Sequence, residues 1–243
     1  MKKFLAMLLS AALLCPAMAM AEDTIKIGIF EPMTGATAAG GSMEKEGFDL
    51  ANELYPDVLG QKIELVYGDN KSDRAEATLA AQSLVDKGVV AVLGSYGSGL
   101  SMAGGEVFAE NEIPALTATA TNPTITLDCE WYARICFIDP FQGTMLARYA
   151  VKNEYKKIAI MREKDSEYSV GLVKYFQDEI ATHDGYEVVA LCDFMNKDED
   201  FSALLGAVLD KKPDVIFTSV SYADKAAQIM KQARALGYEG AFF

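Results

Sequence analysis

The 243-residue sequence predicts an α/β fold with parallel sheets and helices on both faces. Short apolar segments rich in Val, Ile and Leu recur along the chain, and amphipathic segments separate them. Strands that alternate with helices in this way are typical of parallel sheets covered on both sides. The rhythm breaks between residues 124 and 137 and then resumes. We therefore expect two lobes, the first spanning residues 22–139 and the second residues 140–243.

The first 21 residues have the features of a secretory signal peptide. Lys2 and Lys3 precede a short apolar run at 4–14, and Ala19-Met20-Ala21 provides small residues around a cleavage site after Ala21. The run is too short to cross a membrane, and no later segment has about 18 continuous apolar residues. We expect a periplasmic protein that is not inserted in the membrane after cleavage. A lipid anchor at Cys15 is the alternative.

Each element of the first lobe has a local signal. Asp73 is expected to cap a helix, with Glu76 as its capping-box partner, and Gly88 is expected to end that helix. Residues 62–67 alternate between polar and apolar, as in a half-buried strand. The full set consists of strands at 25–30, 62–67, 89–93 and 113–116, and of helices at about 43–54, 73–88 and up to about 111.

The second lobe repeats the pattern after Asp139-Pro140, because a residue before Pro is pushed out of helical geometry. Leu172, Phe176 and Ile180 are spaced by four, which predicts one buried helical face. The expected elements are helices at 142–152, from 169, at 201–209 and at 223–236, and strands at 157–161, 186–191 and 215–218. Residues 240–243 resemble the beginning of a strand, so we expect a fragment whose second lobe and hinge are incomplete.

Two uncharged loops follow neighbouring strands of the first lobe. Gly94–Gly99 and Thr117–Pro123 are rich in Gly and hydroxyl groups. Ligands of parallel α/β sheets bind outside the carboxyl ends of the strands, and N–H groups at a helix N-terminus favour an anion. Hydroxyl oxygens can accept a hydrogen bond from an ammonium group, so the pair of loops suits a zwitterion. A Gly-rich turn without a ligand, and a Thr-rich strand end favoured by β propensity, are the alternatives.

The composition argues against several functions. The formal net charge is −13, whereas binding to nucleic acid or to an anionic membrane surface needs a basic footprint. His183 is the single histidine, and the chain has no Gly-x-Ser-x-Gly elbow, no P-loop and no matching dinucleotide fingerprint. We therefore expect neither an enzyme nor a bound metal or cofactor. Paired carboxylates leave a secreted hydrolase or nucleotide enzyme as an alternative.

Cys129 and Cys136 lie close together in the irregular segment, on either side of the sole Trp. In an exported protein, such a pair is expected to form a local disulfide. A metal site is the weaker alternative, because no His or third Cys is near in sequence. Cys192 ends an apolar run and is expected to be a buried thiol.

Five segments in order along the chain resemble those of bacterial periplasmic receptors for branched-chain amino acids. They are Ile27–Gly35, Ala120–Pro123, Asp165–Gly171, Asp200–Leu205 and Gln232–Gly237. The resemblance implies the Leu/Ile/Val-binding class of type I periplasmic binding proteins. Such proteins close two α/β lobes on an amino acid and deliver it to the permease subunits of an ABC transporter. Receptors for an amide, urea or an aromatic amino acid, and ligand-sensing regulators of the same fold, are the alternatives.

The resemblance also implies a set of binding residues. Ser98, Thr119 and Thr121 would hold the carboxylate and ammonium groups of the ligand from the first lobe. Tyr168 and Tyr222 would close the site from the second lobe.

Two departures from the family pattern affect specificity. The family commonly has an aromatic residue after its Met-Ser/Thr-Gly loop, where this chain has Ala38–Gly41. The acidic residue that pairs with the ligand's ammonium in the family lies beyond Phe243, so the resemblance assigns no such residue here.

Overall fold

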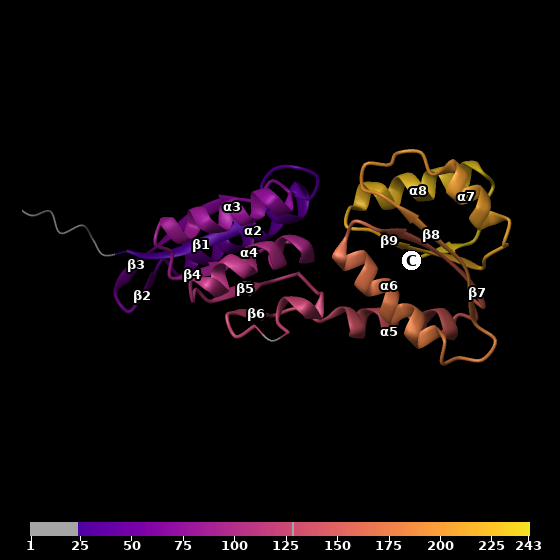
Figure 1. Ribbon diagram of the computed structural model, residues 1–243, viewed down its shortest axis with the longest axis horizontal. Helices are drawn as coiled ribbons and strands as arrows, with labels where there is room; N and C mark the ends of the chain where they lie inside the picture. The colour runs from indigo at the N-terminus through magenta and orange to yellow at the C-terminus, as the bar shows by residue number, and fades with distance from the viewer. Residues whose placement is uncertain (1–23, 128) are drawn as a thin grey trace, which may run out of the picture.

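Two α/β lobes make up the computed structural model, which describes residues 24–127 and 129–243 (Figure 1). The expected signal peptide at 1–21, its cleavage site and Cys15 lie outside the described residues. Within those residues, no helix combines the length and the apolar character that crossing a membrane requires. The expected division at residue 139 falls between the two sheets, since the first sheet ends at Arg134 and the second begins at Lys157.

The first lobe is built on a six-stranded sheet with strand order β2-β3-β1-β4-β5-β6. All neighbours are parallel except β2 and β3, which form an antiparallel pair. The strands are β1 (Ile25–Glu31), β2 (Asp57–Val58), β3 (Gln61–Asp69), β4 (Ala91–Leu93), β5 (Ala115–Thr117) and β6 (Tyr132–Arg134). The segment expected to be irregular thus contains β6. Three residues are too few to show a strand period, and β6 is fixed by its pairing with β5.

Helices cover this sheet and enclose the core of the lobe. They are α2 (Ala38–Leu54), α3 (Arg74–Asp86) and α4 (Ser98–Glu110), and a 3-10 turn follows at Pro123–Ile125. The apolar faces of α3 and α4 pack in one cluster with β1 and β4, in which the rings of Phe30 and Phe108 meet edge to face at 5.4 Å. Helix α2 packs against β1 and β3.

Helix α2 begins at Ala38, five residues before its expected start near Met43. Gly40 and Gly41 made this part of the sequence resemble a loop. In the structure, both glycines serve close packing inside the helix: a Cβ at Gly41 would overlap the carbonyl oxygen of Pro32, and one at Gly40 would lie 2.6 Å from the ring of Tyr96. The glycines therefore mark contacts inside the helix, and the expected start near Met43 was wrong.

The expected cap of α3 is confirmed. Asp73 accepts hydrogen bonds from the backbone N–H groups of Ala75 (2.8 Å) and Glu76 (3.0 Å). The expected capping-box role of Glu76 is wrong, because its carboxylate pairs with Lys71 Nζ at 2.9 Å. One side-chain cap therefore holds the beginning of this helix.

The second lobe has a four-stranded parallel sheet with the order β10-β9-β7-β8. Helices α5 and α6 share one apolar cluster with this sheet, while α7 and α8 share another, so the sheet lies between two helical layers (Figure 1). This confirms the predicted fold class. The elements are α5 (Asp139–Lys152), β7 (Lys157–Glu163), α6 (Glu167–Ile180), β8 (Glu187–Phe194), α7 (Ser202–Leu209), β9 (Val215–Ser219), α8 (Ala223–Ala235) and β10 (Ala241–Phe242).

Helices α5 and α6 both begin earlier than expected. Pro140 lies in the first turn of α5, where the missing N–H of proline costs no intrahelical hydrogen bond. Ser166 caps α6 by accepting the N–H of Ser169 at 3.1 Å. Asp139-Pro140 is therefore the start of a helix.

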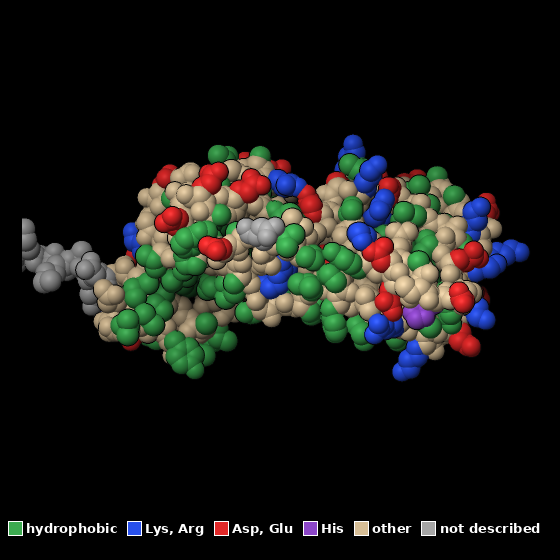
Figure 2. All heavy atoms as spheres, turned by 60° about the horizontal axis from the view of Figure 1, so that its bottom comes forward, with side chains coloured by type: hydrophobic (Ala, Val, Ile, Leu, Met, Phe, Trp, Pro, Cys, Tyr) green, Lys and Arg blue, Asp and Glu red, His purple; other side chains and the backbone are tan. Residues whose placement is uncertain are grey.

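Exposed apolar side chains form a stripe on α5. Phe141 and Met145, one helical turn apart, are 58% and 47% exposed. Hydrophobic side chains gather on the face of the molecule that Figure 2 brings forward, which is the side of α5 and β6 in Figure 1. The outer side of α5 therefore presents an apolar surface to solvent.

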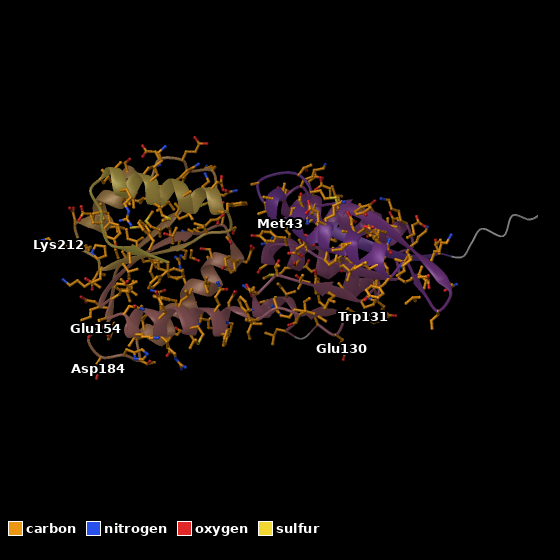
Figure 3. All side chains as sticks on the ribbon, turned by 180° about the vertical axis from the view of Figure 1, so that it is seen from behind. Met43, Glu130, Trp131, Glu154, Asp184 and Lys212 are labelled. Atoms are coloured by element: carbon orange, nitrogen blue, oxygen red, sulfur yellow. The ribbon has the colours of Figure 1, made fainter. Side chains whose placement is uncertain are left out.

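The expected disulfide is absent from this structure, in which Cys129, Cys136 and Cys192 are free. Cys129 packs against the apolar core of the first lobe. The sulfur of Cys136 instead faces the carbonyl oxygen of Ala120 at 3.5 Å. Trp131, next to this pair, projects from the edge of the first lobe (Figure 3). Cys192 is partly exposed and packs beside the α7–α8 core, so the expectation of a fully buried thiol was wrong.

Candidate functional site

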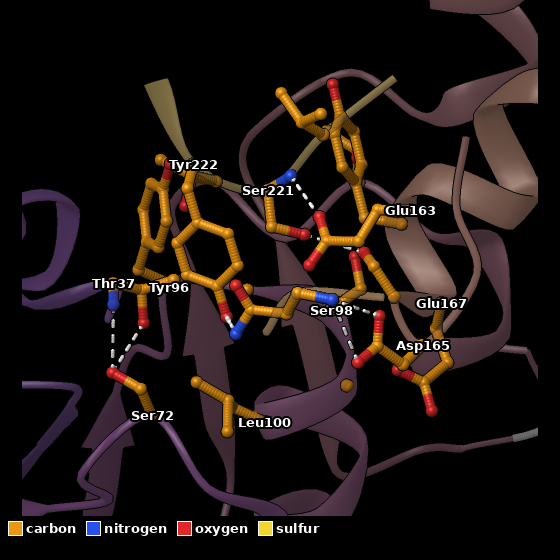
Figure 4. Close-up of a pocket in the computed structure, with 18 of the residues that line it drawn as sticks. Thr37, Ser72, Tyr96, Ser98, Leu100, Glu163, Asp165, Glu167, Ser221 and Tyr222 are labelled. Carbon is orange, nitrogen blue, oxygen red and sulfur yellow. Dashed lines mark hydrogen bonds between the residues drawn. The ribbon is translucent and has the colours of Figure 1, made fainter. Parts of the chain in front are cut away.

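A cavity of about 580 Å³ lies between the two lobes (Figure 4). Loops at the carboxyl ends of strands in both sheets line it, as expected for parallel α/β sheets. All five residues that the sequence singled out line this one cavity: Ser98, Thr119, Thr121, Tyr168 and Tyr222. The structure thus brings together residues that are up to 124 positions apart in the sequence.

The two uncharged loops of the first lobe lie side by side because β4 and β5 are parallel neighbours, with Val92 opposite Ala115. Ser98, at the start of α4, is buried, and its oxygen accepts the N–H of Asn122 at 3.3 Å. A hydroxyl that accepts in this way still has its own proton to donate. Ser98 is therefore suited to an acceptor such as a carboxylate.

The N-terminus of α4 supports the same end of a ligand. Its N-cap residue is Gly97, so no side chain caps the first N–H groups of the helix. Gly97, Gly99 and Leu100 line the cavity beside Ser98. The first-turn N–H groups of a helix have no intrahelical partners and carry a partial positive charge, which favours an anion.

Thr119 and Thr121 have the opposite hydrogen-bonding character. Thr119 Oγ1 donates to the carboxylate of Glu44, and Thr121 Oγ1 donates to Asp139 Oδ1 at 2.5 Å. A hydroxyl has one proton and two lone pairs, so both oxygens keep only acceptor capacity for any further partner. This wall of the cavity is therefore suited to a donor such as an ammonium group.

Hydrogen bonds fix the two tyrosines of the second lobe. Tyr168, in the first turn of α6, accepts from Gln142 Nε2 at 3.0 Å. Tyr222, just before α8, accepts from Asn196 Nδ2 at 3.1 Å. Burial raises the pKa of both phenols, to about 12 for Tyr222, so both are neutral at physiological pH. The two rings are positioned as aromatic walls.

Tyr96 is a site residue that the sequence reasoning missed. It follows β4, lines the cavity, and its ring packs on Gly40 of α2. This ring fills the place next to the Ala38–Gly41 region, where the family pattern would supply an aromatic residue. In Figure 4, Tyr96 lies beside Tyr222 of the opposite lobe. A single Tyr in a Gly-rich loop carried no sequence signal of this contact.

Glu163 was also missed. It ends β7, is 2% exposed, and accepts the N–H of Ser221 at 2.6 Å. Burial raises the pKa of its carboxyl, while the hydrogen bonds from Ser221 oppose the shift. The bond holds the loop that carries Tyr222. The available signal was an acidic residue two positions after the apolar core of a strand.

The two lobes contact each other at the rim of the cavity through Glu167 of α6. Its carboxylate pairs with Arg74 of α3, and its carbonyl oxygen accepts from Asn122 Nδ2 at 3.0 Å. A Cβ at Gly99 would overlap this carboxylate, so the glycine allows the close approach of α4 and α6. These contacts hold one side of the cavity together.

The cavity combines three kinds of side chain and backbone group. Hydroxyl and N–H donors lie at the start of α4, acceptors lie at the two threonines, and aromatic rings come from both lobes. Among residues 24–127 and 129–243, no group of three His, Cys, Asp or Glu side chains is placed to hold a metal ion.

Residues 24–243 match the family model described as periplasmic binding protein. The chain belongs to the periplasmic binding protein family. Its relatives in this family include a Leu/Ile/Val-binding protein of Rhizobium johnstonii, 32% identical over 82% of the chain and 55% of the relative. The Leu/Ile/Val-binding protein of Escherichia coli K12 is 28% identical over 93% of the chain and 62% of the relative. The chain therefore spans less than two thirds of these relatives.

Solved structures of the family agree with the two-lobe fold. A leucine-binding protein of Thermotoga maritima superposes with a TM-score of 0.86 at 36% identity, over 90% of the chain and 62% of that protein. A branched-chain amino acid transporter substrate-binding protein of Streptococcus pneumoniae, solved with isoleucine, gives 0.83 at 31% identity, over 90% and 63%. These likenesses confirm the resemblance and the type I fold expected from the sequence.

Proposed function

We propose that the protein is an extracytoplasmic solute-binding protein that captures an amino acid between its lobes and delivers it to an ABC permease. A branched-chain amino acid is the leading ligand. The main support for this proposal is that the cavity separates donors from acceptors. Donors lie at Ser98 and the start of α4, and acceptors lie at Thr119 and Thr121. The Leu/Ile/Val-binding relatives support the same ligand class.

The ligand is held by its two charged groups and recognised by its side chain. The carboxylate binds Ser98 and the first N–H groups of α4, and the ammonium binds the oxygens of Thr119 and Thr121. The side chain then faces the tyrosines, among them Tyr222. Ligand capture needs no catalytic step, because lobe closure traps the ligand. Closure reports occupancy only if the ligand binds the closed state more tightly.

Calorimetry of the purified protein against the twenty amino acids, amides and urea tests this proposal. We expect heat from Leu, Ile or Val, and Ser98→Ala and Thr121→Ala should each lose about 1–3 kcal/mol of binding. Thr182→Ala is the matched control, because Thr182 is exposed, does not line the cavity, and its hydroxyl donates to the Glu179 carbonyl. The absence of binding heat with every amino acid would contradict the proposal.

Two outcomes would redirect the assignment. Binding of an aromatic amino acid, an amide or urea in place of Leu, Ile and Val would support a solute-binding protein with a different ligand. Tyr96 and Tyr222 would then contact the side chain of that ligand. Tight binding without ligand uptake, in vesicles that contain the permease, would indicate a ligand-sensing regulator of the same fold.

A further inference from the structure

Two carboxyl groups lie directly behind the two threonines of the cavity. Glu44 comes from α2 and accepts the Thr119 hydroxyl, while Asp139 begins α5 and accepts the Thr121 hydroxyl. Asp139 is fully buried, and its Oδ2 atom has no hydrogen-bond partner among the described residues. Neither carboxyl lines the cavity, so any effect on a ligand is transmitted through the threonines.

We propose that Glu44 and Asp139 are positioning residues that hold the hydroxyl protons of Thr119 and Thr121 away from the cavity, so that both oxygens accept from the ligand's ammonium group. The proposal rests on the proposed function, since it assigns how this cleft holds the ammonium of an amino acid. A hydroxyl without such a partner is free to rotate and to point its proton at the ligand. The half-buried Glu44 and the buried Asp139 remove that choice before the ligand arrives.

The negative charge of Glu44 depends on Glu31, its neighbour from β1. Glu31 Oε1 and Glu44 Oε2 are both buried without a hydrogen-bond partner among the described residues, and burial raises the pKa of both carboxyls. Two buried carboxylates in contact cannot both be ionised at neutral pH. After burial, the charge of Glu44 raises the pKa of Glu31 further, so the proton of the pair stays on Glu31. Glu44 then stays an acceptor for Thr119.

Among the described residues, no cation is a cause of the pKa shifts of this glutamate pair. The titratable groups that face it among the described residues are Tyr96 from the β4–α4 loop, Tyr132 from β6 and Cys136 after β6. Burial raises the pKa of all three, so they are neutral at pH 7. One shared proton is therefore the stable state of the pair.

Asp139 gives the proposal a measurable pH dependence. Burial raises its pKa to about 6, against the opposing effects of the Thr121 hydrogen bond and the charge of Arg134 on β6. Tyr168 of α6 and the Cys136 thiol also face this carboxyl, and both are neutral. Asp139 is therefore ionised at neutral pH and protonated below about pH 6. The protonated acid donates to Thr121 and turns the hydroxyl proton toward the cavity.

Affinity as a function of pH tests the proposal. Protonation of Asp139 with a pKa of about 6 should weaken L-leucine binding about fourfold between pH 7.5 and 5.5. Binding of 4-methylpentanoate, which lacks the ammonium group, should not weaken over this range. Asp139→Asn should abolish the acid decline for leucine, and Asp193→Asn should keep it, because Asp193 pairs with Arg162 outside the cavity. An unchanged decline in Asp139→Asn overturns the proposal.

A substitution of Glu44 tests the proposed role of this carboxylate separately. Glu44→Gln keeps an acceptor but removes the charge, and should weaken leucine about tenfold at pH 7.5 while leaving 4-methylpentanoate unchanged. Glu179→Gln is the matched control, since Glu179 pairs with Arg148 on the outer side of the second lobe. Equal losses for both ligands in Glu44→Gln would indicate general damage to the site and would contradict a role toward the ammonium.

A ligand-independent measurement separates failure of this proposal from failure of the proposed function. The pKa of the Asp139 carboxyl, followed by carbon NMR, should rise in Thr121→Val, because the hydroxyl donates to the carboxylate and lowers that pKa. An unchanged pKa overturns the positioning of Thr121 by Asp139 whatever the ligand is. If the pKa rises but no amino acid binds, the proposed function fails, and the assignment of these acceptors to an ammonium fails with it.

Discussion

Replacement of Glu31 by Gln should make the protein more stable at neutral pH. Glu31 ends β1, is fully buried, and its Oε2 atom accepts the N–H of Tyr96 at 2.7 Å. Burial, followed by the charge of Glu44, raises its pKa from 4.5 to about 10. Gln reproduces the protonated acid, because its Oε1 accepts from Tyr96 and its amide group donates to Glu44.

The size of the effect follows from the proton that Glu31 takes up on folding. At pH 7 the carboxyl is ionised in the unfolded protein and protonated in the folded protein. The difference between pH 7 and the ordinary pKa of 4.5 is about 2.5 units, so taking up this proton costs about 3 kcal/mol of the free energy of folding. Because the pKa of Glu31 is raised in the folded protein, the free energy of unfolding is highest below about pH 4.5, where Glu31 is protonated in both states. It falls as the pH rises toward 10. Glu31→Gln should therefore gain little at pH 4.5 and about 3 kcal/mol at pH 7.

Urea unfolding followed by circular dichroism at pH 4.5, 7 and 8.5 measures the gain. Glu179→Gln is the control, because the neighbouring Arg148 lowers the pKa of the half-buried Glu179, and loss of this charge should slightly destabilise the protein above pH 4.5. A Glu31→Gln variant that is less stable than the wild type at pH 7 would refute the reasoning. So would a gain of equal size at pH 4.5 and 8.5.

Two further substitutions test single contacts. Gly40→Ala should leave the fold intact and weaken amino-acid binding in calorimetry, because its Cβ would lie 2.6 Å from the Tyr96 ring and displace it; unchanged binding would mean that this wall is not used. Asp73→Ala removes the cap of α3 and should lower the free energy of unfolding in urea by about 1 kcal/mol, whereas Asp73→Ser should lose less.

Most of the fold could be predicted because its signals are local. The alternation of strands and helices, the cap at Asp73 and the Gly-rich turn after β4 are all written in short windows of sequence. Two of the errors arose where tertiary contacts decide. β6 exists through its pairing with β5, and α2 extends through Gly40 and Gly41 because β1 and Tyr96 approach them closely.

The candidate site divides in the same way. Ser98, Thr119 and Thr121 could be found because they follow strand ends, and their loops meet at one edge of a parallel sheet. The carboxyls behind them could not, since Glu44 is one acid among several on a helix and Asp139 marked only a boundary before Pro140. Their importance lies in partners that are 75 and 18 positions away along the chain.

The packing of Tyr96 on Gly40 has a consequence for redesign of the cleft. The Tyr96 ring occupies a volume that a side chain from either α2 or the β4–α4 loop can fill, so the residues at positions 40 and 96 compete for the same space. An aromatic residue at 40 fits only if 96 becomes small, and a small residue at 96 leaves an opening unless 40 becomes large. A library that randomises one position alone will therefore sample mostly clashes and holes. Paired exchange of the two positions is the productive route to a receptor with altered selectivity.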